Sequence, residues 1–208
     1  MTVMSLRAYA NRWAHDFGLS HSEIYGRIRG LVDAGFLAED QKAGEYSKHK
    51  YLSADNWAMV LIAVLAGDSK AMATQRVATV ASLPDVSDYM AASDSTSPLR
   101  PGGNGDPGSA DLRALATDDG NAMTLRDVLA HVLREPRLYG RVEVLRVSRH
   151  LDQAGLFLRD GGEGTRAEII FARRVVVPTT FDAVAAIDGT AFDQFLADLD
   201  VYCGPPNA

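Results

Sequence analysis

The sequence predicts an α+β fold in two parts, and three observations lead to that prediction. Apolar residues recur at helical spacing over most of the first 83 residues. A stretch rich in Gly, Pro, Ser and Asp covers residues 84–110. Three short apolar runs separated by turn residues follow after residue 140. We therefore expect a mainly helical unit with a hairpin at 1–83, a flexible linker at 84–110, and an α+β domain with a small antiparallel sheet at 111–208.

The bulk composition is that of an ordinary globular protein. Of the 208 residues, 47% are hydrophobic and 23% are charged. The best candidate for a membrane-spanning segment, 58–66, is about half the roughly 20 residues that such a helix needs. The single cysteine, Cys203, excludes an internal disulfide and any multi-cysteine metal site. We expect a cytoplasmic protein without a signal peptide, a membrane anchor, a bound metal or a cofactor.

The charge is unevenly distributed along the chain. The formal net charge is −6 at pH 7, which argues against bulk electrostatic attraction to nucleic acid. Residues 1–56 carry seven basic and seven acidic side chains, so the acidic excess lies entirely after them. The N-terminal segment is therefore the part of the chain best suited to an anionic partner.

Two helices are predicted at the start of the chain. Apolar side chains at helical spacing predict the first helix over 6–17, and Gly18 turns the chain after it. Ser20 and Glu23 have the spacing of a capping box, which predicts the start of a second helix. This helix is expected to run to Ala34 and to end at Gly35 in the left-handed conformation.

A hairpin and two further helices complete the predicted N-terminal unit. The runs 36–38 and 48–52 are apolar enough to pair as strands around a polar tip. Ser53 is placed to cap a helix over 54–66, and a further helix is expected over 70–81.

After the predicted linker, helices and strands are mixed. Thr124 and Asp127 have capping spacing and predict a helix through Leu133. Strands are expected over 141–147, 155–159 and 165–172, with the glycine-rich turn 160–164 joining the last two. Helices are expected over 181–187 and 190–199. We assign this domain a role in self-association or in contact with a protein partner.

The second helix separates apolar from polar residues. Ile24, Ile28 and Leu31 fall on one face at steps of four and three. The opposite face carries a set of small or polar residues: Ser22, Tyr25, Gly26 and Arg29. A helix that reads DNA needs this division, with one face packed on the domain and the other free to enter the major groove.

The segment that follows Gly35 has the composition of a loop that rests on phosphates. Its tip and return strand, 41–51, hold three lysines, a histidine and two tyrosines. Together with the capped helix, residues 5–66 resemble the winged helix-turn-helix superfamily, in particular its MerR-like and excisionase-like DNA-binding domains. The pattern departs from MerR proteins in a longer second helix that lacks their Arg-Tyr pair.

The resemblance implies DNA binding, so we expect double-stranded DNA as the partner and a homo-oligomer as the binding unit. It assigns DNA contacts to eight residues: Ser22, Tyr25, Arg27, Arg29, Lys42, Lys48, His49 and Lys50. A bacterial or phage transcription regulator is the first interpretation. A phage small terminase or other DNA-recognition subunit, and a winged-helix adaptor that binds protein only, are the alternatives. No motif resembles an active site, and the five histidines are scattered, so catalysis is not expected.

Overall fold

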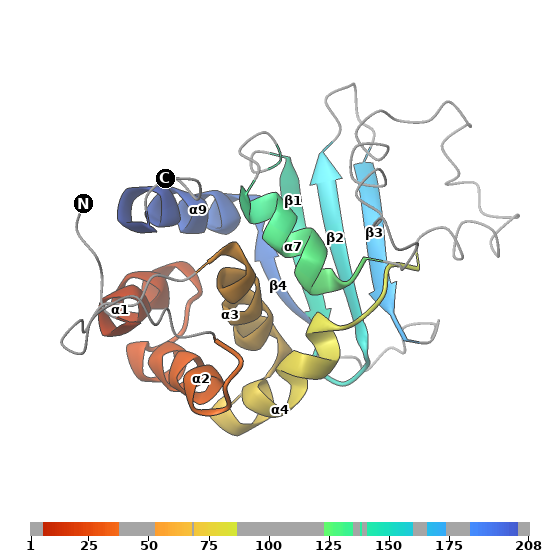
Figure 1. Ribbon diagram of the computed structural model, residues 1–208. Helices are drawn as coiled ribbons and strands as arrows, with labels where there is room; N and C mark the ends of the chain where they lie inside the picture. The colour runs from red at the N-terminus through yellow and green to blue at the C-terminus, as the bar shows by residue number, and fades with distance from the viewer. Residues whose placement is uncertain are drawn as a thin grey trace, which may run out of the picture.

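The computed structural model describes residues 6–37, 53–67, 69–86, 123–134, 138, 141–159, 166–173 and 184–203. These residues form six helices and one four-stranded antiparallel sheet, which confirms the predicted α+β class. The sheet lies at one side of the molecule, with α3 and α7 beside it and α1, α2 and α4 further away (Figure 1). No helix within these ranges is long and apolar enough to cross a bilayer.

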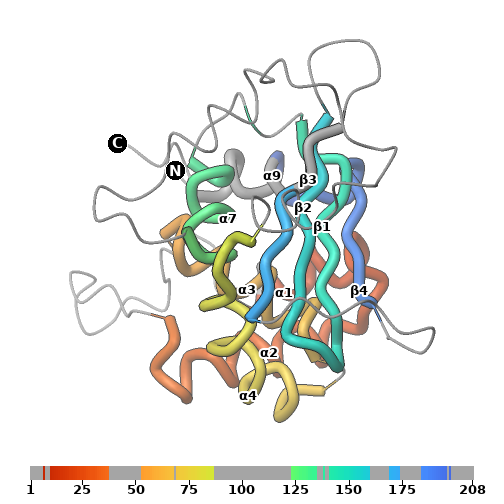
Figure 2. Tube along the Cα trace, turned by 90° about the vertical axis from the view of Figure 1, so that its right-hand side faces the viewer, coloured from red at the N-terminus to blue at the C-terminus, as the bar shows by residue number. Residues whose placement is uncertain are grey.

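The sheet is a three-stranded meander with a fourth strand added beside the first. Its strands are β1 (Val142–Ser148), β2 (Gln153–Arg159), β3 (Arg166–Ala172) and β4 (Val184–Asp188). The order across the sheet is β3-β2-β1-β4, and every pair is antiparallel. Figure 2 views the sheet from its β3 edge, with α7, α3 and α4 on one side of it. The three strands expected from the sequence are confirmed with small changes in their ends.

The sequence predicted a helix over 181–187, and this prediction is wrong, because residues 184–187 belong to the fourth strand. Residues 184–188 pair instead with β1, with Ala186 opposite Arg146 and Ile187 opposite Leu145. The run Val184–Ile187 has an alanine-rich composition that suits a helix. The second edge of β1 needs hydrogen-bond partners, however, and this tertiary requirement outweighs the local preference.

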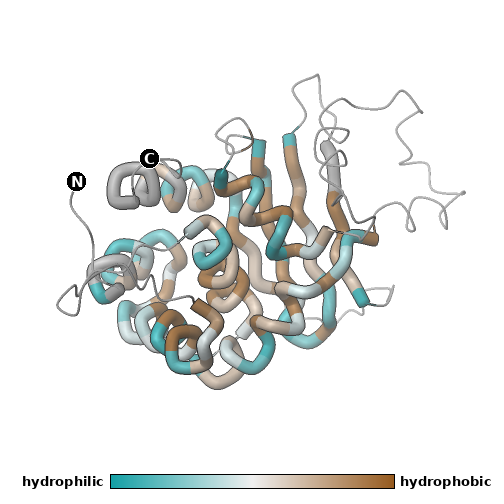
Figure 3. The backbone as a smooth tube through the Cα atoms, in the orientation of Figure 1, coloured by the Kyte–Doolittle hydropathy of each residue, from teal (hydrophilic) through white to brown (hydrophobic). Residues whose placement is uncertain are grey.

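Helix α3 (Ala54–Ala66) is at the centre of the core. It is apolar all round, and every residue from Asn56 to Ala66 is buried. It packs against α4 (Lys70–Ala81), α7 (Leu125–Arg134), α2 (His21–Asp33) and the sheet. Figure 3 shows hydrophobic residues along this helix and along the strands beside it. A helix without a polar face has to be covered on every side, and the other elements do this.

The local signals at the helix ends are confirmed. Ser53 caps α3, and Thr124 forms a reciprocal pair with Asp127 at the start of α7. Gly18 and Gly35 have φ values of 61° and 74°, the left-handed conformation that favours glycine. The first helix, α1 (Leu6–Asp16), ends one residue earlier than expected.

Elements from both sides of the predicted linker share one hydrophobic core. Phe195 of α9 (Gly189–Cys203) lies with its ring centroid 5.1 Å from that of Trp13 and 6.0 Å from that of Trp57. Asp55 of α3 forms ion pairs with Arg126 and Arg134 of α7. The predicted boundary near residue 84 therefore does not coincide with a break in the packing.

The start of the predicted linker also needs correction. Pro84 and Asp85 form β-bridges with Thr124 and Phe171, and the Val86 amide donates to the Ile170 carbonyl. Residues 84–86 thus extend the sheet beyond β3, because their main-chain groups complete the edge of that strand. The rest of the predicted linker, 87–110, lies outside the described residues.

The shared core leads to a stability prediction. Phe195→Ala should destabilise the whole described fold by about 3–5 kcal/mol, because the ring is fully buried against both tryptophans. The urea midpoints measured by tryptophan fluorescence and by circular dichroism should fall together. The fluorescence signal comes from Trp13 and Trp57, the chain's two tryptophans, and both lie against Phe195. Phe157→Ala, on the other face of the sheet, is the control and should cost less. An unchanged fluorescence transition in Phe195→Ala would indicate two independent domains.

Candidate functional site

Helix α2 begins with a complete capping box. The Glu23 amide donates to the Ser20 hydroxyl at 3.3 Å, and the Ser20 amide donates to the Glu23 carboxylate at 2.8 Å. The Ser20 hydroxyl donates to the same carboxylate oxygen at 2.6 Å. These hydrogen bonds from Ser20 hold the pKa of Glu23 below its ordinary value, with a smaller contribution from the charge of Arg27. The start of the helix is therefore fixed by local contacts.

The inner face of α2 holds the three predicted aliphatic residues and one arginine. Ile24, Ile28 and Leu31 are at most 1% exposed. Arg27 is also buried, at 2% exposure, and its Nη1 donates to the Val64 carbonyl near the end of α3. The assignment of Arg27 to DNA is therefore wrong. Its place three residues after Ile24 puts it on the core face, where its charge complements the carbonyl end of α3.

The outer face of α2 brings together three of the predicted contact residues. Ser22 and Arg29 are exposed, and Tyr25 is partly buried between them. The rings of His21 and Tyr25 are stacked, with their centroids 5.8 Å apart. We call Ser22, Tyr25 and Arg29 the outer stripe of α2.

The two glycines of α2 face a protein neighbour. A Cβ atom on Gly30 would lie 2.6 Å from the Thr74 hydroxyl oxygen on α4, whereas a Cβ atom on Gly26 would lie 4.0 Å from the Lys70 Cβ. At Gly30 the close neighbour is therefore α4. Gly26 also faces α4, so it does not belong to the outer stripe.

A charged cluster borders the outer stripe. The Asp33 carboxylate pairs with the Arg29 Nε at 2.9 Å and with the Lys70 Nζ at 3.5 Å. A shallow groove of about 570 Å³ opens between α2 and α4, with Gly30, Asp33, Lys70 and Thr74 in its lining. Asp33 and Lys70 were not among the contact residues predicted from the sequence. The i,i+4 spacing from Arg29 to Asp33 was a usable signal, but the partner from α4 depends on tertiary packing.

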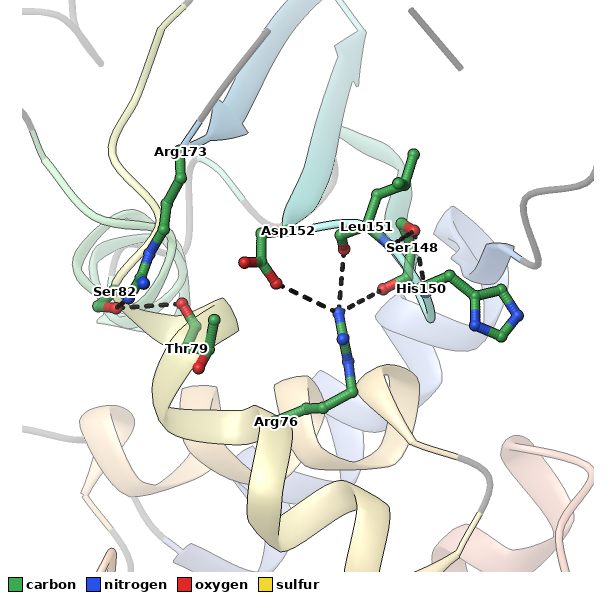
Figure 4. A network of polar contacts seen from close by, with 8 residues as sticks. All are labelled: Arg76, Thr79, Ser82, Ser148, His150, Leu151, Asp152 and Arg173. Atoms are coloured by element: carbon green, nitrogen blue, oxygen red, sulfur yellow. Dashed lines mark hydrogen bonds and ion pairs between the residues drawn. The ribbon is translucent and has the colours of Figure 1, made fainter. Parts of the chain in front are cut away.

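The far end of α4 is tied to the sheet by polar contacts (Figure 4). Arg76 donates to the Leu151 carbonyl at 3.0 Å and lies 3.6 Å from the Asp152 carboxylate, both in the turn between β1 and β2. Arg173, just after β3, donates to the Ser82 hydroxyl. These contacts hold α4 against the turn between β1 and β2 and against the end of β3. The groove wall that α4 provides therefore has a fixed position relative to the sheet.

The remaining predicted contacts, Lys42, Lys48, His49 and Lys50, lie outside the described residues, as do residues 38–52 of the predicted hairpin 36–52. Phe36 and Leu37, at the start of its first predicted strand, are described and are not part of a strand. Comparison with protein-family models, curated proteins and solved structures finds no match. The interpretation of the site therefore rests on its own residues.

The two glycines of α2 should respond in opposite ways to alanine. Gly26→Ala should raise the free energy of unfolding by up to about 1 kcal/mol, because it adds helix propensity and its Cβ fits. Gly30→Ala should lower it by about 1–3 kcal/mol, because Thr74 or α4 must move. Chemical denaturation of both variants measures the difference. Equal stabilisation by both would show that α2 and α4 are not in close contact.

The capping box should make stability depend on pH. Since the pKa of Glu23 is lowered in the folded state, its contribution is present at higher pH and is lost as the pH falls below 4.5, the ordinary glutamate value. The stability difference between wild type and Glu23→Gln should therefore shrink in acid, as measured by denaturation at several pH values. In a Ser20→Ala background the pH-dependent difference should be smaller, because the carboxylate has lost a hydroxyl donor. A pH-independent difference would contradict the assignment.

Proposed function

We propose that this protein binds double-stranded DNA through α2 and acts in the cytoplasm as a bacterial or phage transcription regulator. The observation that carries the proposal is the outer stripe. Ser22, Tyr25 and Arg29 are the groups that can reach base edges, and they lie on the solvent side of a helix whose other side is buried.

The way in which α2 is held also supports a reading role. A tight turn at Gly18 connects it to α1, and the capping box sets its start. Arg27 fastens it to the end of α3 from the core side. A reading helix must keep its side chains in register with the bases, and contacts at both its start and its middle provide this rigidity.

Self-association is part of the proposal. A single short helix contacts only a few base pairs, so DNA-binding units of this kind gain affinity and specificity as symmetric pairs. We assign the pairing to the C-terminal half of the chain.

A protein-binding adaptor is the second candidate, and the lack of a basic surplus favours it. Arg29 is neutralised by Asp33, Arg27 is buried, and the whole chain has a net charge of −6. Strong DNA binders usually present a basic surplus on the contact surface.

Fluorescence anisotropy with a selected duplex and a random duplex distinguishes the two candidates. Arg29→Ala should weaken binding by about 1–3 kcal/mol, mainly on the selected sequence. Lys48→Ala should weaken binding to every duplex and reduce the salt slope by about one. Arg159→Ala, an equal loss of charge on the exposed end of β2, is the control and should have little effect. If Arg29→Ala and Lys48→Ala both leave binding unchanged, the adaptor replaces the regulator.

A further inference from the structure

Asp33 is the point where the charges of α2 and α4 meet. Its carboxylate contacts Arg29 on its own helix at 2.9 Å and Lys70 on the neighbouring helix at 3.5 Å. All three side chains are about half exposed, at 53% for Arg29, 47% for Asp33 and 52% for Lys70. One exposed carboxylate therefore engages two exposed cations beside the outer stripe.

The position of Lys70 relative to α2 is determined by packing. It is the first residue of α4, after the capping residue Ser69. One turn further along α4, Thr74 lies so close to Gly30 that a single methyl group would not fit between them. The start of α4 also carries the positive end of the helix dipole. The start of α4, and with it the backbone of Lys70, therefore has a fixed place on the rim of the α2 surface.

We propose that Lys70 is a phosphate-binding cation beside the base-reading outer stripe and that Asp33 acts as an internal competitor for the DNA backbone. In the free protein Asp33 pairs with both cations. On binding, phosphate oxygens of the duplex replace the carboxylate at Lys70, and Arg29 leaves the carboxylate for a base edge. This inference rests on the proposed DNA-binding function and adds to it a residue from α4 and a means of limiting nonspecific affinity.

The exchange of partners is physically reasonable. Exposed ion pairs contribute little to stability, so giving up the contacts with Asp33 costs little. A carboxylate that remains within a few ångströms of a phosphate repels it, and this repulsion is the same for every base sequence. Asp33 should therefore weaken binding to all duplexes and leave the ratio between selected and random duplexes unchanged.

The test measures the affinity of the full chain for selected and random duplexes at several salt concentrations. Asp33→Asn should bind both duplexes about three- to tenfold more tightly than wild type at low salt. Asp193→Asn, the same change on the exposed surface of α9, is the matched control and should give a smaller gain. Lys70→Ala should weaken binding to both duplexes and reduce the salt slope by about one. Asp33→Ser is a second variant, and circular dichroism checks that each protein is folded.

Each outcome bears on a different claim. A gain in both Asp33 variants above that of Asp193→Asn, together with a reduced slope in Lys70→Ala, supports the inference. If wild type binds but the Asp33 variants bind no better than the control, or Lys70→Ala keeps the wild-type slope, the inference is overturned and the proposed function stands. If neither wild type nor Asp33→Asn binds any duplex at low salt, both are overturned.

Discussion

The burial of α3 on all sides is the constraint on which the other elements depend. A helix with no polar face cannot be left against water, so the sheet, α7, α4 and α2 are arranged around it. The end of the helix is covered as well, since Arg27 donates to the Val64 carbonyl from α2. The proposed reading helix is thus positioned by the same burial that forms the core. The residues of its inner face are therefore restricted to side chains that fit this core.

Local contacts were predictable from the sequence, and contacts between distant residues were not. The capping residues of α2, α3 and α7 and the left-handed Gly18 and Gly35 all act within a few residues, so their spacing in the chain was sufficient. The strand at 184–188 and the location of Lys70 beside Asp33 depend on partners far away in the sequence. The burial of Arg27 is an intermediate case: its spacing from Ile24 indicated the core face, but its charge favoured a surface position.

Three sides of α2 have different neighbours, which limits what the helix can present. One side packs into the core, and a second side lies so close to α4 that Gly30 is required there. The outer stripe that remains is narrow, and one of its three residues, Arg29, also forms an ion pair with Asp33. An interaction through this surface therefore depends on a few side chains and on the local charge balance, which is consistent with recognition by specific contacts and not by bulk attraction.

The contact between Trp13 and Phe195 has a consequence for the order of folding during synthesis. The two rings lie 5.1 Å apart in the finished protein, yet roughly 180 residues separate them in the chain. At the usual rate of translation, the partner of Trp13 is made about 10–40 s after it. Until then the surface of α1 that receives Phe195 has no partner from α9, so the N-terminal helices reach their final packing only when the last helix has left the ribosome.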